Sequence, residues 1–468
     1  MDEVAGPVGS GSLSEQLAAY WADARFDDLP AEVVHAAKRC LLDTVAAGAA
    51  GGRTAVVDTV VAAMRAGGSG DGEAVLWGRS ETLAPAAAAL VNGTAAHALE
   101  LDDFGGCGHS GAVVIPAVCA LALRHRFSGR DAIVAIAAGY DLAGRVLEGS
   151  GGYRPHNEHG WHSTGTCGSF GAAAAAAKAL RASRETLTQA LGIAGTFTGG
   201  TWAFLADGAM VKRFHPGKAS ETGLSAALLA HAGLTGPTQV LDAAWGGFYP
   251  TYAPGFATPQ RAVQDLGRSF HILNSGIKPY ACCRTIHSCI DAALQIMAAA
   301  PGGSRSVKAL IVHGNAQTQR QFSRSGRDIR SLLEAQFSMP YCLAVTVDSG
   351  RATLEQFQPL RVDDPEIARL MAVTEIHADR VLGPADYPSL EIVFSDGRRE
   401  LRDIPFAKGA PEAPVTDAEL TDKAGGLLTA GLGERAARRV VELAWKLDEL
   451  EDFSALVALL RAGEHGVG

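Results

Sequence analysis

The chain has 468 residues, of which 47% are hydrophobic, and a formal net charge of −9. A single hydrophobic core rarely grows to this length, so we expect two domains. The negative charge argues against a nucleic-acid partner, because such proteins carry a basic face. It does not exclude an anionic substrate, since a local group of Lys, Arg and His sets the sign of a site.

Eight cysteines are spread through the chain without regular spacing, which is unlike a secreted disulfide framework. The N-terminal residues show no basic stretch followed by an apolar one, so no signal peptide is expected. The longest apolar run, 112–123, is too short to span a bilayer. We therefore expect a cytoplasmic protein with no membrane partner.

Most of the first half of the chain has a helical pattern. Residues 1–12 are rich in Gly and Ser and predict a flexible lead. Pro30 opens a segment whose apolar residues recur at helical spacing through Val45. Further helices are expected at about 53–66, 84–101, 112–126, 130–148, 165–181, 185–198 and 218–232.

The pattern changes after residue 254. Two β-branched stretches, 307–312 and 390–394, predict strands, and the turn at 395–397 returns the chain through 399–401. Helices are expected near 285–299 and 363–371, and a capping box at Thr416 opens a helical tail. The fold class is thus mainly α with an α+β second domain, divided as 13–264, 265–405 and a tail, 406–468, that packs on the first domain.

Polar residues gather where helical segments stop. Asp102 and Asp103 precede a Gly-rich loop that ends at His109, a pairing that favours acid–base chemistry; a solvated helix end is the alternative. The Gly-rich loop also matches GxGxxG from Gly106. The residues before it are helical and not a strand, so we do not expect a dinucleotide site.

His156, His159 and His162 form an HxxHxxH run. Three imidazoles could bind a metal, but Gly and Pro flank the run, so convergent rings are not assured and we expect no metal site. Cys282, Cys283 and Cys289 lack the spacing of common iron–sulfur loops, so no cluster is expected either.

Cationic residues mark two further breaks. Lys212, Arg213 and His215 lie just before the expected helix at 218, where a basic turn could clamp a carboxylate. Lys278, with Arg284 and His287 nearby, repeats this arrangement in the second domain. The alternative for both is a solvated basic surface.

Six segments together resemble the MmgE/PrpD family, which includes 2-methylcitrate dehydratase, cis-aconitate decarboxylase and iminodisuccinate epimerase. They are 92–103, 160–166, 212–219, 233–237, 278–280 and 337–344. Each segment is weak evidence alone, and their common order along about 13–460 makes the resemblance specific.

The resemblance implies a large helical domain built from both chain ends, a smaller α+β lid domain, a homodimer and an active site between the domains. It also implies chemistry on small polycarboxylates without a metal or organic cofactor. The positions that match the family's site are Asp102 or Asp103 (with Asp103 favoured), His109, His162, Lys212, Lys278 and Tyr341.

Two positions depart from the family pattern. Phe104 follows the acid pair where Thr or Ser is common, and the loop to His109 is short, so a methylcitrate specificity does not transfer directly. Phe104 could instead add an apolar wall to a substrate pocket. Decarboxylases carry His five positions past the second Lys, whereas this chain has Cys283. The second departure counts against a decarboxylase.

These observations predict a cofactor-independent lyase, foremost a dehydratase of a hydroxylated di- or tricarboxylate. Lys212, Lys278 and Arg284 would bind the anionic carboxylates, and His162 and His109 would exchange protons. Alternatives are an epimerase that uses Cys283 as an acid or base, a cis-aconitate-type decarboxylase, and a non-catalytic binding protein. In the family picture Asp103 tunes a His and Tyr341 completes the pocket.

Overall fold

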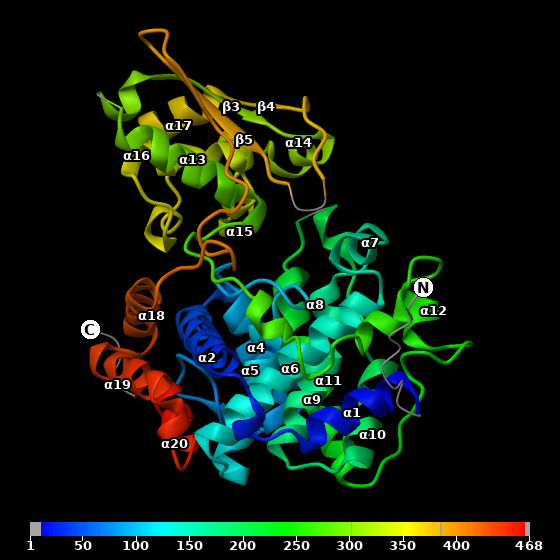
Figure 1. Ribbon diagram of the computed structural model, residues 1–468. Coiled ribbons are helices and arrows are strands. Elements are labelled where there is room, and N and C mark those ends of the chain that lie inside the picture. Colours follow the sequence, from blue (N-terminus) through cyan, green and yellow to red (C-terminus); the bar gives the residue numbers. More distant parts are fainter. Residues whose placement is uncertain (1–10, 207, 301, 384–385, 464–468) are drawn as a thin grey trace. The chain divides into compact units, whose positions relative to one another are not determined.

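The computed structural model describes residues 11–463 except 207, 301 and 384–385 (Figure 1). The chain divides into two compact units. The helical unit comprises 1–98, 102–275 and 416–468, and the mixed unit comprises 99–101 and 276–415. The predicted class, a helical domain with an α+β second domain, is confirmed.

The helical unit follows the predicted periodicity closely. Runs of Ala favour helix because this side chain loses no rotamer entropy on ordering. Its helices are α1 (Leu13–Asp23), α2 (Ala31–Gly51), α3 (Ala55–Ala66), α4 (Pro85–His97), α5 (Ser110–His125), α6 (Gly129–Gly149), α7 (Tyr153–Glu158), α8 (Ser163–Thr166), α9 (Gly168–Ala179), α10 (Arg184–Thr196), α11 (Val211–His231), α12 (Phe248–Tyr252), α18 (Asp417–Leu432), α19 (Glu434–Trp445) and α20 (Ser454–Val457).

Small residues let these helices pack closely. Helix α11 packs against α4, α9 and α10, and α6 packs against α9. A Cβ atom on Gly171 of α9 would lie 2.5 Å from the carbonyl oxygen of Gly139 on α6, so the two backbones touch there. Within the described residues, no helix is both long and apolar enough to cross a membrane.

Both ends of the chain build the helical unit. Helices α18 and α19 pack against α2, as Figure 1 shows with the orange and red segments beside the blue one. The predicted capping box at Thr416 is present, since its hydroxyl accepts from the Glu419 amide and the Glu419 carboxylate accepts from Thr416. Of the expected flexible lead, 1–10 lie outside the described residues, and Ser12 caps α1.

The basic segment that begins at Lys212 is helical, which corrects the expectation of a turn before residue 218. Helix α11 starts at Val211 and includes Pro216. Proline removes one backbone hydrogen bond and usually stops a helix. Here the close packing of the next residue, Gly217, on α4 supports the helix through the proline. Tertiary packing therefore overrides the local signal.

Among the described residues, the mixed unit contains a sheet with the strand order β4-β3-β5-β6. Strand β3 pairs parallel with β4 and antiparallel with β5, which pairs antiparallel with β6. The strands are β3 (Val307–His313), β4 (Thr374–His377), β5 (Ser389–Phe394) and β6 (Arg399–Arg402), and the helices are α13 (His287–Ala298), α14 (Ala316–Phe322), α15 (Leu332–Gln336), α16 (Met339–Ser349) and α17 (Pro365–Ala372).

The sequence predicted β3, β5, β6, α13 and α17 in this unit but not β4 or α14 to α16. Strand β4 is four residues long and has a single buried residue, Ile376, so its pattern is too short to read. The helical unit also holds a small hairpin of β1 (Ala74–Val75) and β2 (Thr82–Leu83) that the sequence did not predict. Two-residue strands carry no periodic signal.

Candidate active site

A close crossing of α4 and α11 places Lys212 beside His97. A Cβ atom on Gly217 would lie 2.1 Å from the carbonyl oxygen of Leu90, and one on Gly93 would lie 2.7 Å from the Cα atom of Gly217. The two helix backbones therefore touch. About one turn beyond this contact, Lys212 Nζ lies 2.7 Å from His97 Nε2.

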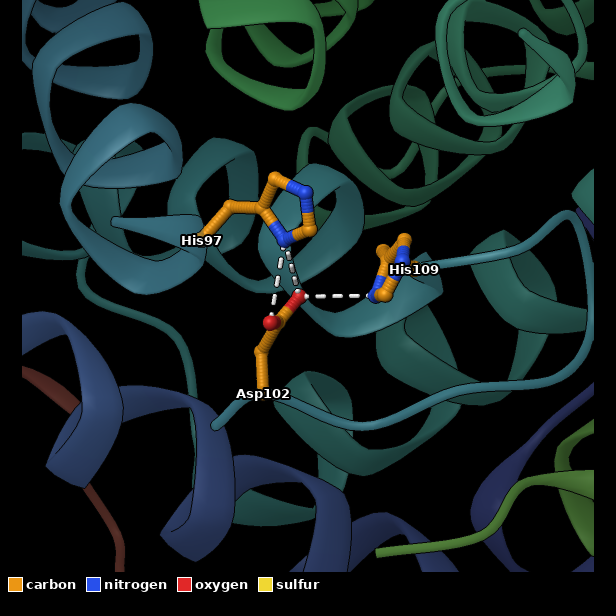
Figure 2. A group of neighbouring side chains, drawn as sticks. All are labelled: His97, Asp102 and His109. Carbon is orange, nitrogen blue, oxygen red and sulfur yellow. Dashed lines mark hydrogen bonds and ion pairs between the residues drawn. The ribbon is translucent and has the colours of Figure 1, made fainter. Parts of the chain in front are cut away.

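The loop after α4 brings a carboxylate between two imidazoles (Figure 2). His97 Nδ1 lies 3.0 Å from both carboxylate oxygens of Asp102, and His109 Nδ1 lies 3.1 Å from Asp102 Oδ2. The loop follows a helix, as predicted, and not the strand of a dinucleotide fold. At Gly108, φ is +123° and a Cβ atom would lie 2.5 Å from Thr164 Oγ1, so only glycine fits.

The partners fix the protons of this network. A Lys212 ammonium can only donate, so His97 Nε2 accepts and its Nδ1–H donates to Asp102. Burial alone would raise the pKa of Asp102, but its interactions with the imidazoles of His97 and His109 outweigh burial and hold that pKa well below its usual value. Asp102 is therefore an ionised carboxylate shared by two imidazoles.

Asp103, which the sequence favoured as the acid of the site, lies beside Tyr140 and not beside the imidazoles. Tyr140 donates its hydroxyl to Asp103 Oδ2 at 2.6 Å, and the Gly111 amide donates to Oδ1 at 3.0 Å. Burial raises the pKa of Asp103 to about 7. The side chain that contacts the imidazoles is Asp102, and Asp103 contributes only its backbone oxygen to His109, at 2.9 Å.

His162 pairs with His215. Their Nδ1 atoms are 2.9 Å apart, so one must donate and the other accept. Burial, followed by the charge of Lys212, lowers the pKa of His162 well below its usual value and that of His215 to about 4. Both imidazoles are therefore neutral near pH 7, and a neutral imidazole can act as a base.

The three histidines of the HxxHxxH run have separate partners. His156 Nε2 lies 2.8 Å from Thr166 Oγ1, and the ring of His159 packs on Phe256 with centroids 5.3 Å apart. His162 faces His215. The run is therefore not assembled as a chelating set in the described structure.

Two predicted substrate-binding residues also lie in the helical unit. Arg213 follows Lys212 in the first turn of α11, and its side chain is buried. Phe104 is half-buried in the loop between Asp103 and His109.

In the mixed unit, Lys278 is buried against Glu100. Lys278 Nζ lies 3.2 Å from Glu100 Oε2 and 3.2 Å from the Glu100 carbonyl oxygen. Glu100 has a φ of 55°, a backbone conformation that is uncommon for a residue other than glycine. An uncompensated buried charge would be costly, so this carboxylate balances Lys278.

Cys283 is half-buried, and its amide donates to the Gln336 carbonyl oxygen at 3.0 Å. His287 is buried, with Nε2 3.3 Å from the Cys282 carbonyl oxygen. Cys289 Sγ contacts a backbone oxygen at 3.5 Å, and burial raises the pKa of its thiol to about 12. Cys289 therefore fills buried space.

Arg284 and Tyr341 also contact their own unit. The Arg284 guanidinium lies over the Tyr387 ring, 5.1 Å from its centroid, and burial lowers its pKa. The Tyr341 hydroxyl donates to the Gln356 carbonyl oxygen at 2.9 Å and accepts from the Arg361 amide at 3.0 Å. Tyr341 therefore also stabilises the structure around α16.

Two family models match the chain. The MmgE/PrpD N-terminal domain matches residues 15–260, and the MmgE/PrpD C-terminal domain matches residues 280–449. The chain belongs to the MmgE/PrpD family.

Relatives match this MmgE/PrpD protein over nearly its whole length. A cis-aconitate decarboxylase of Aspergillus terreus is 30% identical, over 96% of this chain and 96% of its own. The cis-aconitate decarboxylase-like protein oryM of Aspergillus oryzae is 29% identical over 96% and 97%, and the human cis-aconitate decarboxylase is 26% identical over 96% and 95%. These likenesses support decarboxylase- or dehydratase-type chemistry in the family, and no particular substrate.

The sequence patterns did not single out His97 and Glu100. Both lie within the 92–103 segment that carried the family resemblance, yet neither was chosen as a site residue. His97 reads as the last residue of an apolar helix, and a buried His is usually a core residue. Its position, five residues before Asp102 at a helix end, was the available signal.

His97, Asp102 and His109 are also close enough to hold a metal ion, since their ligand atoms lie within 4.8 Å of one another. Two imidazoles and a carboxylate suit zinc or a similar divalent cation. The Lys212 ammonium, 2.7 Å from His97 Nε2, places a positive charge next to that position. This charge opposes a cation and favours an anionic substrate.

Proposed function

We propose that this chain is a lyase that removes CO2 from a small unsaturated polycarboxylate of the cis-aconitate type. The names of relatives that match over nearly their whole length favour this activity over the dehydratase that the sequence predicts foremost. The observation that carries the proposal is the contact of Asp102 with His109, next to Lys212 and His97. In this network His109 is an acid whose protonated form the Asp102 carboxylate stabilises, and Lys212 is the nearby cation.

The chemistry needs those two groups. When an allylic carboxylate leaves as CO2, its C–C bond breaks and the electron pair forms a new double bond. The electron pair of the old double bond then takes a proton at the far carbon. Negative charge builds up along the substrate as this happens, so a positioned acid and a fixed cation both lower the barrier.

We assign the proton transfer to His109. Its side chain is 15% exposed, whereas those of His97 and Asp102 are fully buried. Because Nδ1 lies 2.9 Å from the Asp103 carbonyl oxygen and 3.1 Å from Asp102 Oδ2, the other nitrogen can carry the proton to the substrate, and the Asp102 carboxylate stabilises the imidazolium. Lys212 would bind a substrate carboxylate, and water would return to His109 the proton that it gives to the far carbon.

The test is proton NMR of the purified, EDTA-treated enzyme with cis-aconitate. We expect a new terminal alkene signal and release of CO2. His109→Gln should lower kcat by about 10²–10⁴-fold. His35→Gln is the matched control, because His35 is an exposed histidine that bonds to Asp417 at 3.2 Å. Equal activity of the His109→Gln enzyme and the wild type would exclude His109 as the acid.

A hydro-lyase is the second candidate, and Cys283 is the observation that favours it. In the family pattern, decarboxylases have His at this position. Cys283→His should therefore raise the ratio of decarboxylation to dehydration when cis-aconitate and a hydroxylated tricarboxylate are compared, while Cys283→Ser should not. Exchange of a substrate proton in D2O, with no alkene formed, would instead indicate an epimerase.

The roles of the mixed-unit residues are also proposals. Lys278 and Arg284 would bind carboxylates, so Lys278→Ala and Arg284→Ala should raise KM more than they lower kcat. We also propose that two copies of this chain form a homodimer. Sedimentation velocity would measure the molecular mass in solution and so check this.

A further inference from the structure

A second group of two histidines and one aspartate lies on the sheet of the mixed unit. Strands β3 and β4 are parallel, and their register pairs His313 with His377. Asp379 follows two residues after β4. The Gly314 amide donates to the His377 carbonyl oxygen at 2.9 Å, and the Arg380 amide donates to the Gly314 carbonyl oxygen at 2.8 Å. The backbone on both sides of Asp379 is therefore held in place.

The two imidazoles are oriented alike by carboxylates. His377 Nε2 lies 2.8 Å from Glu375, and His313 Nε2 lies 3.5 Å from Glu391. The Nδ1 atoms of His313 and His377 lie 2.7 and 4.0 Å from the same oxygen of Asp379. A carboxylate on the outer nitrogen of each ring leaves the inner nitrogen available as a ligand, as in carboxylate–histidine–metal sites.

We propose that His313, His377 and Asp379 bind one divalent cation of the zinc class, which includes Ni²⁺ and Cu²⁺. The ligand atoms lie within 4.8 Å of one another. Bond lengths of about 2.0–2.2 Å to Zn²⁺ need only small side-chain movements from these positions. Two imidazole nitrogens favour these metals over Mg²⁺ and Ca²⁺, which prefer oxygen ligands.

The charges around the cluster also favour a cation. Arg399 binds Glu391 through two contacts of 2.7 and 2.9 Å, and Arg380 pairs with Asp403 at 2.8 Å. These arginines are thus engaged with other carboxylates, and Asp379 keeps its charge toward the imidazoles.

A bound cation would fasten an edge of the sheet. Strand β4 pairs with β3 alone in the described sheet, and the cluster joins the end of β4 to β3. Binding to the folded state and not to the unfolded chain stabilises a protein by mass action. The site lies outside the residues assigned to the reaction, so the cation would control stability of the mixed unit.

The first experiment is calorimetric titration of the EDTA-stripped, dialysed full chain with zinc chloride. The His97 cluster could also take zinc, so the measured quantity is the difference between proteins. The variant His313→Ala/His377→Ala should bind one zinc ion fewer per chain than the wild type, and Glu375→Gln should bind that ion about tenfold more weakly. The control His35→Ala should match the wild type.

Crystals soaked in zinc chloride give a second measurement that needs no variant. An anomalous peak between the two Nδ1 atoms and Asp379 would support the site. Zinc peaks only elsewhere, or equal zinc content in the wild type and the double variant, would overturn it. Because neither readout uses turnover, the outcome is independent of the proposed decarboxylase activity.

Discussion

Within the described residues, two clusters have the same composition, each with two histidines and one aspartate. In the helical unit, the side chains of His97 and Asp102 are fully buried and that of His109 is 15% exposed. In the mixed unit, the side chains of His313, His377 and Asp379 are 23%, 43% and 43% exposed. The two clusters therefore differ in burial and in neighbouring residues, although their residue types are the same.

The neighbours decide what each cluster can bind. Lys212 adjoins the buried cluster, so the charge beside that cluster suits an anion. Glu375 and Glu391 adjoin the exposed cluster, so that one suits a cation. In water the charges of an exposed cluster are screened, whereas the buried network depends on every partner. Substitutions should therefore have large effects in the first cluster and small ones in the second.

The largest effect is expected for Asp102→Asn. The substitution keeps the volume but removes the charge that both imidazoles share, and we expect kcat to fall by about 10²–10⁴-fold. The matched control is Asp417→Asn, which removes the carboxylate next to the exposed His35. Steady-state kinetics on both variants decide the point. Turnover within severalfold of wild type for Asp102→Asn would remove Asp102 from the mechanism.

Asp102→Ala should also destabilise the fold. It leaves His97 and His109 without their buried carboxylate, a kind of loss that costs about 3–5 kcal/mol. Urea denaturation, monitored by circular dichroism, measures the change in the free energy of unfolding. If the free energy of unfolding fell by less than about 1 kcal/mol, the network would be weaker than its distances imply.

Asp103 should give the stability a distinct dependence on pH. Its folded pKa of about 7 lies above the value of about 3.9 in an unfolded chain. Between these values the folded protein binds more protons, so this group lowers stability as pH rises from about 4 to about 7. Asp103→Asn should lose that slope. Urea denaturation of both proteins at several pH values measures this dependence. If the free energy of unfolding changed with pH by the same amount in both proteins, the raised pKa of Asp103 would be contradicted.

The smallest effect is expected for His313→Ala in EDTA. Partly exposed ion pairs contribute little, and we expect a change within about 0.5 kcal/mol in the free energy of unfolding. With zinc chloride added, the wild type should gain stability and the variant should not. Thermal melts with and without zinc measure both. A large loss in EDTA would mean that the ion pairs themselves hold β4.

Much of the fold could be read from the sequence. The Ala-rich helices follow from the helix propensity of Ala, and β3 and β5 have buried residues that largely alternate with less buried ones. Strand β6 is exposed, and the turn at 395–397 is what indicates it. The start of α11 was wrong because Pro216 is a local stop signal, and contact with α4 outweighs it. Strand β4 was missed because four residues give no period, and only pairing with β3 defines it.

The sequence by itself determined the family, the fold class and the segments that hold the polar residues. Which neighbouring acid faces the imidazoles depended on how the backbone turns after α4, and that turn placed Asp102 and not Asp103 beside His109. The pairing of Lys212 with His97 joins residues far apart in the chain. It exists because Gly93 and Gly217 let two helices touch, a contact that only the tertiary structure decides.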